Sequence, residues 1–119
     1  MIDFGFFRLA KSASTHSNHR YQMGCVISVH GKAVSVGFNF CKTHPQHTTA
    51  ERPSIHAEVS AVIHAQCNIS GGTAWVYRES KEGKLAMAKP CERCQMILQE
   101  AGIKKVFYTT TNGWEEMSL

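Results

Sequence analysis

Two stretches of sequence decide the fold of this chain: His56-Ala57-Glu58 and Pro90-Cys91-Glu92-Arg93-Cys94. One imidazole and two thiolates are three ligands for a tetrahedral zinc ion. The fourth position is left to water, which distinguishes catalytic zinc sites from closed structural ones. Glu58 lies two residues from the histidine, near enough to exchange protons with that water without binding the metal. The two stretches therefore predict a catalytic metal site.

The pattern H-x-E…P-C-x-x-C is the signature of zinc-dependent nucleobase deaminases, and the chain resembles the cytidine and deoxycytidylate deaminase superfamily. Residues 23–28 and 36–39 resemble the first hairpin of that family, and residues 101–108 resemble the strand after its second metal-binding helix. The resemblance implies one catalytic Zn²⁺ held by His56, Cys91 and Cys94, with Glu58 as the catalytic acid and base.

The resemblance also implies the reaction, which converts a cytosine nucleotide or nucleoside to its uracil form with release of ammonia. Glu58 is expected to move a proton from the attacking water to N3 of cytosine and to assist the leaving amine. Asn39 ends the Gly-Phe-Asn of the hairpin, where the family contacts the sugar of its substrate. The backbone N–H of Ala57 is expected to bind the carbonyl of the base.

Three functional classes stay open at this point, and we favour a deoxycytidylate- or cytidine-type enzyme. The second class is a polynucleotide deaminase that acts on cytosine or adenine in single-stranded DNA or RNA, because residues 78–89 form a charged extra segment beside the predicted site. The third class is a non-catalytic zinc-binding module, which would leave Glu58 without a purpose. A substrate other than cytosine is also compatible with the superfamily.

A second set of metal-ligand types stands at Cys41, His44 and His47. Some deoxycytidylate deaminases carry a second, structural zinc in this region. We favour a polar loop without a metal here, and we expect a single catalytic zinc.

Composition limits the remaining questions. The 119 residues fit one zinc-dependent deaminase domain over 1–119, and 43% hydrophobic and 18% charged residues are ordinary for a soluble protein. The net charge of +4 is compatible with a phosphorylated substrate. We find no membrane span and no signal peptide, and an odd count of five cysteines favours a reducing cytoplasm. A domain this small is expected, by analogy with related deaminases, to form a homo-oligomer that completes its pocket.

Hydrophobic periodicity predicts the order α-β-β-α-β-α-β. The first helix covers residues 3–15, and a hairpin follows over 25–29 and 33–36. Ser54 is expected to cap the second helix, and Gly102 to end the third. The buried stripe of the second helix is predicted at Val59, Val62, Ile63 and Cys67.

This order predicts a cytidine-deaminase-like three-layer α/β fold, in which a mixed sheet of four or five strands carries helices on both faces. Eleven residues follow Tyr108. They are short for the last helix and the fifth strand of the family, which is why both a four-stranded and a five-stranded sheet stay open.

Overall fold

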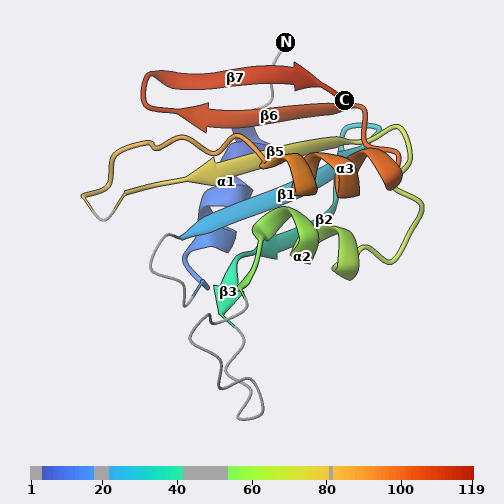
Figure 1. Ribbon diagram of the computed structural model, residues 1–119, viewed down its shortest axis with the longest axis horizontal. Helices are drawn as coiled ribbons and strands as arrows, with labels where there is room; N and C mark the ends of the chain where they lie inside the picture. Colours follow the sequence, from blue (N-terminus) through green and yellow to red (C-terminus); the bar gives the residue numbers. More distant parts are fainter. Residues whose placement is uncertain (1–3, 18–21, 42–53, 81) are drawn as a thin grey trace.

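A computed structural model describes residues 4–17, 22–41, 54–80 and 82–119 of the chain (Figure 1). The helical and extended segments follow the order predicted above, with two short strands added before the second helix and a further strand at the end. The helices are α1 (Phe4–Ser14), α2 (Ala57–His64) and α3 (Glu92–Glu100). The strands are β1 (Met23–Val29), β2 (Lys32–Phe38), β3 (Phe40–Cys41), β4 (Ser54–Ile55), β5 (Thr73–Arg78), β6 (Lys105–Thr110) and β7 (Gly113–Ser118).

Five of the strands form one mixed sheet in the order β2-β1-β5-β6-β7. Strands β5 and β6 are parallel, and α3 lies in the crossover between them. The other neighbours in the sheet are antiparallel. The strands β3 and β4 pair separately as a short two-stranded sheet. The predicted mixed sheet is therefore confirmed, with β5 and β6 as its parallel pair.

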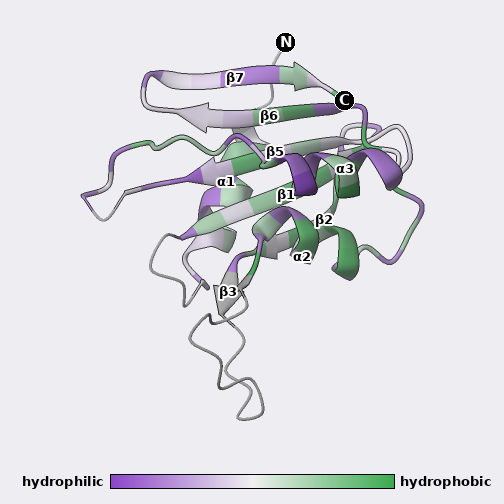
Figure 2. Ribbon diagram, viewed as in Figure 1, coloured by the Kyte–Doolittle hydropathy of each residue, from purple (hydrophilic) through white to green (hydrophobic). Residues whose placement is uncertain are grey.

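Helices cover both faces of the main sheet, as predicted (Figure 1). Helix α1 packs on one face, where an aromatic cluster includes Phe6, Phe7 and Phe107. Trp75 stacks on Phe107 with ring centroids 4.4 Å apart. Helices α2 and α3 lie on the other face, over an aliphatic cluster of β1, β5 and β6. Figure 2 shows the hydrophobic residues concentrated on the central strands and α2. No helix in the described ranges has the length and apolar character needed to cross a membrane.

Of the two alternatives left open by the sequence, four or five strands, the structure has five. Strand β7 pairs antiparallel with β6 from Thr110↔Gly113 to Lys105↔Ser118, so a tight hairpin replaces the crossover helix. Gly113 has a φ of +142°, which an L side chain rarely adopts. A hairpin needs far fewer residues than a helical crossover, and the eleven residues after Tyr108 are enough for it.

The predicted buried stripe of α2 is wrong for Ile63 and Cys67, which are exposed, whereas Val62 is partly buried and packs against the core. The residues of α2 that face the core are Ala57, Glu58, Ser60 and Ala61, which are small or polar. Ile63, predicted to be buried, is 63% exposed. The reason is that α2 packs too close to β2 for large side chains to fit between them, so helical spacing of large apolar residues does not identify the buried face.

Gly37 in β2 permits this close approach. A Cβ atom at Gly37 would lie 2.7 Å from the carbonyl oxygen of Ala57 and 2.8 Å from Cα of Ala61. The hydroxyl of Ser35 donates a hydrogen bond of 2.5 Å to the carbonyl of Ala61 and holds the helix from the same strand. Since α2 begins at the residue after His56, this contact fixes the position of the first predicted metal ligand.

The predicted role of Gly102 at the end of α3 is confirmed. Gly102 has a φ of +92°, and its N–H donates to the carbonyl of Gln99. The N–H of Ile103 donates to the carbonyl of Leu98, which completes a Schellman motif. This motif turns the chain from α3 directly into β6.

Candidate metal and catalytic site

His56 occupies the N-cap position of α2, with extended backbone angles of φ −73° and ψ 152° and no capping hydrogen bond from its side chain. The prediction that Ser54 caps this helix is therefore wrong. Ser54 belongs to β4, where it pairs with Cys41. Because the His56 imidazole does not cap its own helix, it is directed towards α3.

The two cysteines lie at the start of α3. Cys91 is the N-cap residue, and Cys94 follows in the first turn. The side-chain amide of Gln95 donates a hydrogen bond of 2.8 Å to the carbonyl of Pro90, which fixes the chain where it enters the helix. A spacing of three residues places both sulfurs on one side of the turn, and Cys94 is buried while Cys91 is exposed.

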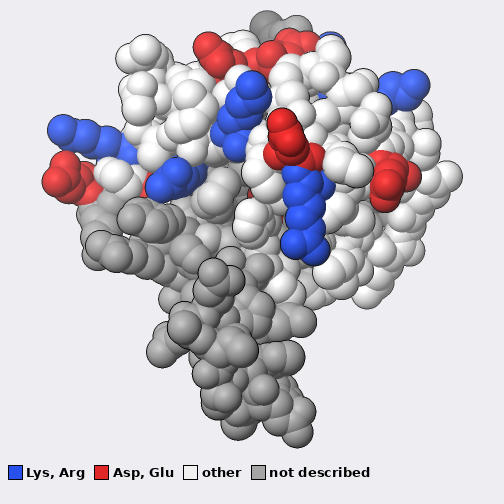
Figure 3. All heavy atoms as spheres, viewed as in Figure 1, with Lys and Arg blue, Asp and Glu red and all other residues white. Residues whose placement is uncertain are grey.

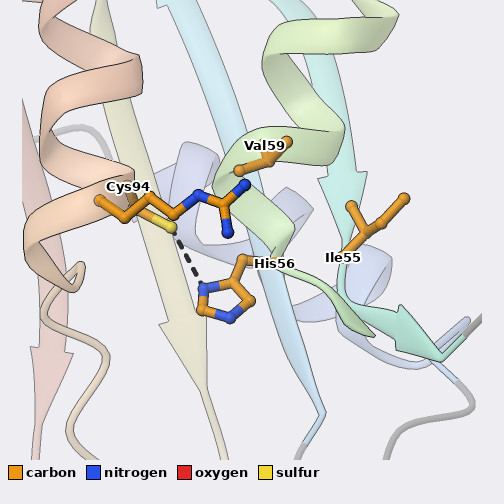
Figure 4. Close-up of a pocket in the computed structure, with 5 residues that line it drawn as sticks. Ile55, His56, Val59 and Cys94 are labelled. Atoms are coloured by element: carbon orange, nitrogen blue, oxygen red, sulfur yellow. Dashed lines mark hydrogen bonds between the residues drawn. The ribbon is translucent and has the colours of Figure 1, made fainter. Parts of the chain in front are cut away.

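The structure brings the three predicted ligands together from two helices, and Figure 4 shows two of them, His56 and Cys94. Nδ1 of His56 lies 3.2 Å from Sγ of Cys94 and 3.8 Å from Sγ of Cys91. The three ligand atoms lie within 4.8 Å of one another. Zinc bonds of about 2.0–2.1 Å to nitrogen and 2.3 Å to sulfur separate the N and S atoms of a tetrahedral site by about 3.5 Å. The two N–S distances lie on either side of this value, so the donor set fits zinc.

The predicted catalytic residue Glu58 lies in the first turn of α2 and is only 2% exposed. Its Oε1 atom is buried without a hydrogen-bond partner among the described residues. Burial raises the pKa of the Glu58 carboxyl, against smaller opposing effects from the backbone and His56. A buried polar atom without a partner is costly and rare, and a water or ligand in the site would give this oxygen a partner.

The thiols next to Glu58 are also shifted away from ionisation. Burial raises the pKa of Cys94 well above its usual range, and the carboxyl of Glu58 and the neighbouring Cys91 add to the effect. Cys25 of β1 is fully buried. Burial is the main cause that raises its pKa as well, and the nearby Glu58 and Cys94 add to this effect. This concentration of acidic groups in a buried space favours a bound cation, which reverses the sign of such shifts.

The two predicted substrate contacts occupy different environments. Ala57 is the first residue of α2 and is fully buried, at a helix start where backbone N–H groups lack intrahelical partners. Asn39 is 5% exposed, and its side-chain oxygen accepts a hydrogen bond of 2.7 Å from the N–H of Met23. Asn39 thus links the start of β1 to the end of β2, in addition to the role predicted for it.

The second predicted metal set cannot be placed in the same way. Its residues His44 and His47 lie outside the described residues, and so does the side chain of Cys41. Within the described part of the chain, one group of three metal-ligand side chains is present, and it is the set of His56, Cys91 and Cys94.

A cavity of about 130 Å³ lies against the metal-ligand set. Its walls come from β4, α2 and α3, and Figure 4 shows His56 and Cys94 facing each other across it. Three of the residues that line it, Ile55, Val59 and Arg93, were not predicted as site residues. Arg93 could have been found, because it stands between the two cysteine ligands. The lining residues are Ile55, His56, Val59, Arg93 and Cys94.

The charged segment before α3 is folded back on itself. Glu79 and Leu85 form an isolated antiparallel bridge, and the hydroxyl of Thr109 in β6 donates to the carbonyl of Ala86 over 2.9 Å. The guanidinium of Arg78 donates to the carbonyl of Met87. The described residues of this segment are not among those that line the cavity.

The geometry defines a class of protein: an α/β domain with a His-Cys-Cys metal set and a buried carboxyl, as in hydrolases that use zinc to activate water. The sequence matches the family described as "Cytidine and deoxycytidylate deaminase zinc-binding region" over residues 3–110. The chain belongs to this family of zinc-binding deaminases.

Two relatives are similar to the chain in sequence. An uncharacterised deaminase encoded in the 3′ region of luxG in Aliivibrio fischeri is 30% identical over 110 residues, which are 86% of this chain and 68% of the relative. The riboflavin biosynthesis protein RibD of Actinobacillus pleuropneumoniae is 32% identical over 117 residues, which are 90% of this chain but 26% of the relative. The chain thus spans about a quarter of the RibD protein.

The fold matches the dCMP deaminase of the cyanophage S-TIM5. The TM-score is 0.67 at 24% identity, and the match covers 87% of this chain and 79% of the phage enzyme. The phage enzyme has also been solved in complex with dCMP and dUMP. At this level of identity the similarity shows the three-layer fold and confirms the fold class predicted from the sequence.

Proposed function

We propose that the chain, as one deaminase domain, is a zinc-dependent hydrolase that converts a cytosine nucleotide or nucleoside to its uracil form with release of ammonia. The observation that carries this proposal is the buried carboxyl of Glu58 beside the ligand set of two helices, with its Oε1 atom unpartnered among the described residues. A closed structural zinc site has no use for such a carboxyl, because its four ligands complete the metal. The preferred substrate is deoxycytidylate or a related compound.

His56, Cys91 and Cys94 would hold the zinc ion, which when bound makes water acidic enough to supply a nucleophile at neutral pH. Glu58 accepts a proton from the attacking water and donates it to N3 of the ring. It then assists protonation of the amine that leaves from C4, so water and cytosine become uracil and ammonia. A carboxyl whose pKa is raised by burial is suited to both steps, because it holds and releases protons nearer to neutral pH.

Two further residues position the substrate in this proposal. The backbone N–H of Ala57, at the start of α2, binds the carbonyl of the base. Asn39 contacts the sugar from the end of β2, where its bond to Met23 holds the side chain in place. The exposed start of α3 at Cys91 leaves the metal set open to solvent on one side.

The RibD relative supports a second candidate within the same chemistry. At 32% identity over 90% of this chain, it favours an aminated pyrimidine of riboflavin biosynthesis as an alternative substrate. The reaction would again replace an amino group by oxygen with loss of ammonia. Glu58 and the three metal ligands would keep the same roles.

Ammonia release by the zinc-loaded protein tests the proposal. The substrate panel is cytidine, deoxycytidine, their monophosphates, an aminated pyrimidine ribonucleotide, adenosine and a short single-stranded oligonucleotide, with Glu58→Gln as the control. Turnover of a free cytosine compound that is lost in the control is the expected result. Turnover of the oligonucleotide alone would move the assignment to a polynucleotide deaminase. Silence across the panel in the zinc-loaded protein would leave the non-catalytic module.

A further inference from the structure

The cavity beside the metal set is small and only partly apolar. Its volume of about 130 Å³ is well below the roughly 300–1,000 Å³ of pockets that enclose a whole drug-sized ligand. Ile55 and Val59 provide the apolar walls, while His56 and Cys94 belong to the metal set. The cavity has room for a single heterocyclic ring but not for a whole nucleotide, so a substrate whose ring lies beside the metal set would extend through its opening.

Arg93 stands where that remainder would lie. It lines the cavity, yet its side chain is exposed, so it spans the boundary between the cavity and solvent. It directly precedes Cys94, which places its Cα about 3.8 Å from the Cα of a metal ligand. Of the residues that line the cavity, Arg93 alone carries a permanent positive charge.

The Arg93 guanidinium has neither an ion pair nor a hydrogen bond to any other residue in the described ranges. The salt bridge found there joins Lys105 to Glu116 on the β6–β7 hairpin. Arg78, by contrast, donates to the carbonyl of Met87 and is held against its own segment. Figure 3 shows Lys and Arg side chains interspersed with Asp and Glu over the face that carries α3, so the positive charge at the cavity comes from Arg93 itself and not from a uniformly basic surface.

We propose that Arg93 binds the phosphate of a phosphorylated substrate and so selects nucleotides over nucleosides. This inference rests on the proposed deaminase function, and it specifies the class of substrate within it. A guanidinium presents several N–H donors in a fixed fork that matches two phosphate oxygens at once. With the ring in the cavity, the phosphate lies outside it, within reach of the Arg93 guanidinium, which has no partner within the described ranges. The same contact serves a cytosine nucleotide and an aminopyrimidine nucleotide.

The test compares Arg93→Ala and Arg93→Lys with the parent chain in the zinc-loaded form. Arg8→Ala is the matched control, because it removes the same charge from an exposed position on α1, on the opposite face of the sheet. The first measurement is kcat/KM for deoxycytidine monophosphate and for deoxycytidine. The second is equilibrium binding of deoxyuridine monophosphate, deoxyuridine and inorganic phosphate by calorimetry, which needs no turnover. Zinc content is measured for every variant.

We expect Arg93→Ala to lower both kcat/KM and binding affinity for the monophosphate by about tenfold or more, because one charge-assisted contact is lost. The values for the nucleoside should change little. Arg93→Lys should recover part of the loss, since it keeps the charge but lacks the fork. Arg8→Ala should behave as the parent. An equal loss for nucleotide and nucleoside, an equal effect of Arg8→Ala, or a loss of zinc in Arg93→Ala would overturn the proposal.

The two measurements separate this inference from the deaminase proposal. If no compound is turned over, the proposed function fails, and binding still decides the role of Arg93. Tighter binding of the monophosphate than of deoxyuridine, lost in Arg93→Ala, supports the phosphate site independently of catalysis. Equal binding of the two compounds by the parent chain refutes it. If turnover is present and Arg93→Ala does not alter the preference, the deaminase stands and the phosphate contact is refuted.

Discussion

The substitution Gly37→Ala tests how packing of α2 on the sheet holds the metal site. The backbone of Gly37 has no positive φ, so alanine is allowed there and only the added methyl group matters. That group would meet three backbone atoms of α2: the carbonyl oxygen of Ala57 at 2.7 Å, Cα of Ala61 at 2.8 Å, and the nitrogen of Ala61 at a still closer approach. None of them can rotate away, as a flexible side chain would.

The magnitude follows from these distances. Carbon contacts are comfortable at about 3.5–4.0 Å, so α2 must move by about 0.7 Å or more. Overpacking of this kind typically costs about 1–3 kcal/mol. At an unfolding entropy of about 2.1 cal/mol/K per residue, each kcal/mol lowers Tm by about 4 °C in a chain of 119 residues, so the expected decrease in Tm is about 4–12 °C. Because His56 and Glu58 move with α2, we also expect weaker zinc binding and a loss of turnover approaching 100-fold, the effect of a misplacement of about 1 Å.

Thermal unfolding, a zinc-competition titration and ammonia release measure the three effects. Gly24→Ala is the control, because its methyl group would meet the backbone of α1 at Ala10 and Ser14, on the opposite face of the sheet. The control should lose stability but keep its zinc affinity. The reasoning is refuted if Gly37→Ala keeps the zinc affinity and activity of the parent, or if both variants lose zinc equally.

Three further predictions concern the site and its support. Glu58→Gln should keep zinc and fold, measured by metal analysis and circular dichroism, while turnover falls by about 10²–10⁴-fold, the usual contribution of acid–base catalysis; retained turnover would exclude Glu58 as the proton carrier. Chelation should lower the free energy of unfolding of the parent by about 3–4 kcal/mol when the reference zinc concentration is 100–1,000 times Kd. Cys91→Ser should abolish most of this difference, whereas Cys67→Ser, an exposed cysteine outside the metal set, should not; the same response in both would contradict the ligand assignment. Burial and the carboxylate of Glu115, which accepts a hydrogen bond of 2.9 Å from the Tyr108 hydroxyl, raise the pKa of Tyr108. As pH rises, the tyrosine of the unfolded chain loses its proton before that of the folded chain, so the free energy of unfolding should fall above about pH 10. Denaturant titrations at several pH values should show a smaller fall in Tyr108→Phe. The same dependence of the free energy of unfolding on pH in both proteins would exclude this tyrosine as the cause.

Much of the fold is visible in the sequence because local signals and packing agree. The first hairpin was predicted from two β-rich runs around a glycine turn, and Gly31 there has a φ of +77°. Gly102 was predicted to end α3 and does so through a Schellman motif. Trp75 and Tyr77 lie two residues apart in the sequence, a spacing that places them on one face of a strand, and both belong to the aromatic cluster under α1. In each case the signal lies within a few residues of the feature that it predicts.

The errors arise where a distant contact decides the outcome. The buried face of α2 depends on Gly37, about 20 residues earlier in the chain, and this contact admits Ala57 and Ala61 but not larger residues. The position of β7 depends on its pairing with the edge of β6, which eleven residues reach only as a hairpin. The role of Arg93 depends on its place in the wall of a cavity between two helices. No local pattern of hydrophobic residues carries this information.

The most informative error is the one at α2, because it coincides with the candidate site. A helix that packs on a sheet is expected to bury apolar residues, yet the buried face of α2 includes the Glu58 carboxyl, with one oxygen unpartnered. Leaving such a group unsatisfied costs about 1–3 kcal/mol, a large fraction of the stability of a small domain. A sequence breaks its own folding pattern in this way chiefly where function requires it. Burial keeps the carboxyl next to the predicted metal ligands, and the small residues Ala57, Ser60 and Ala61 on the same face let α2 bring it there.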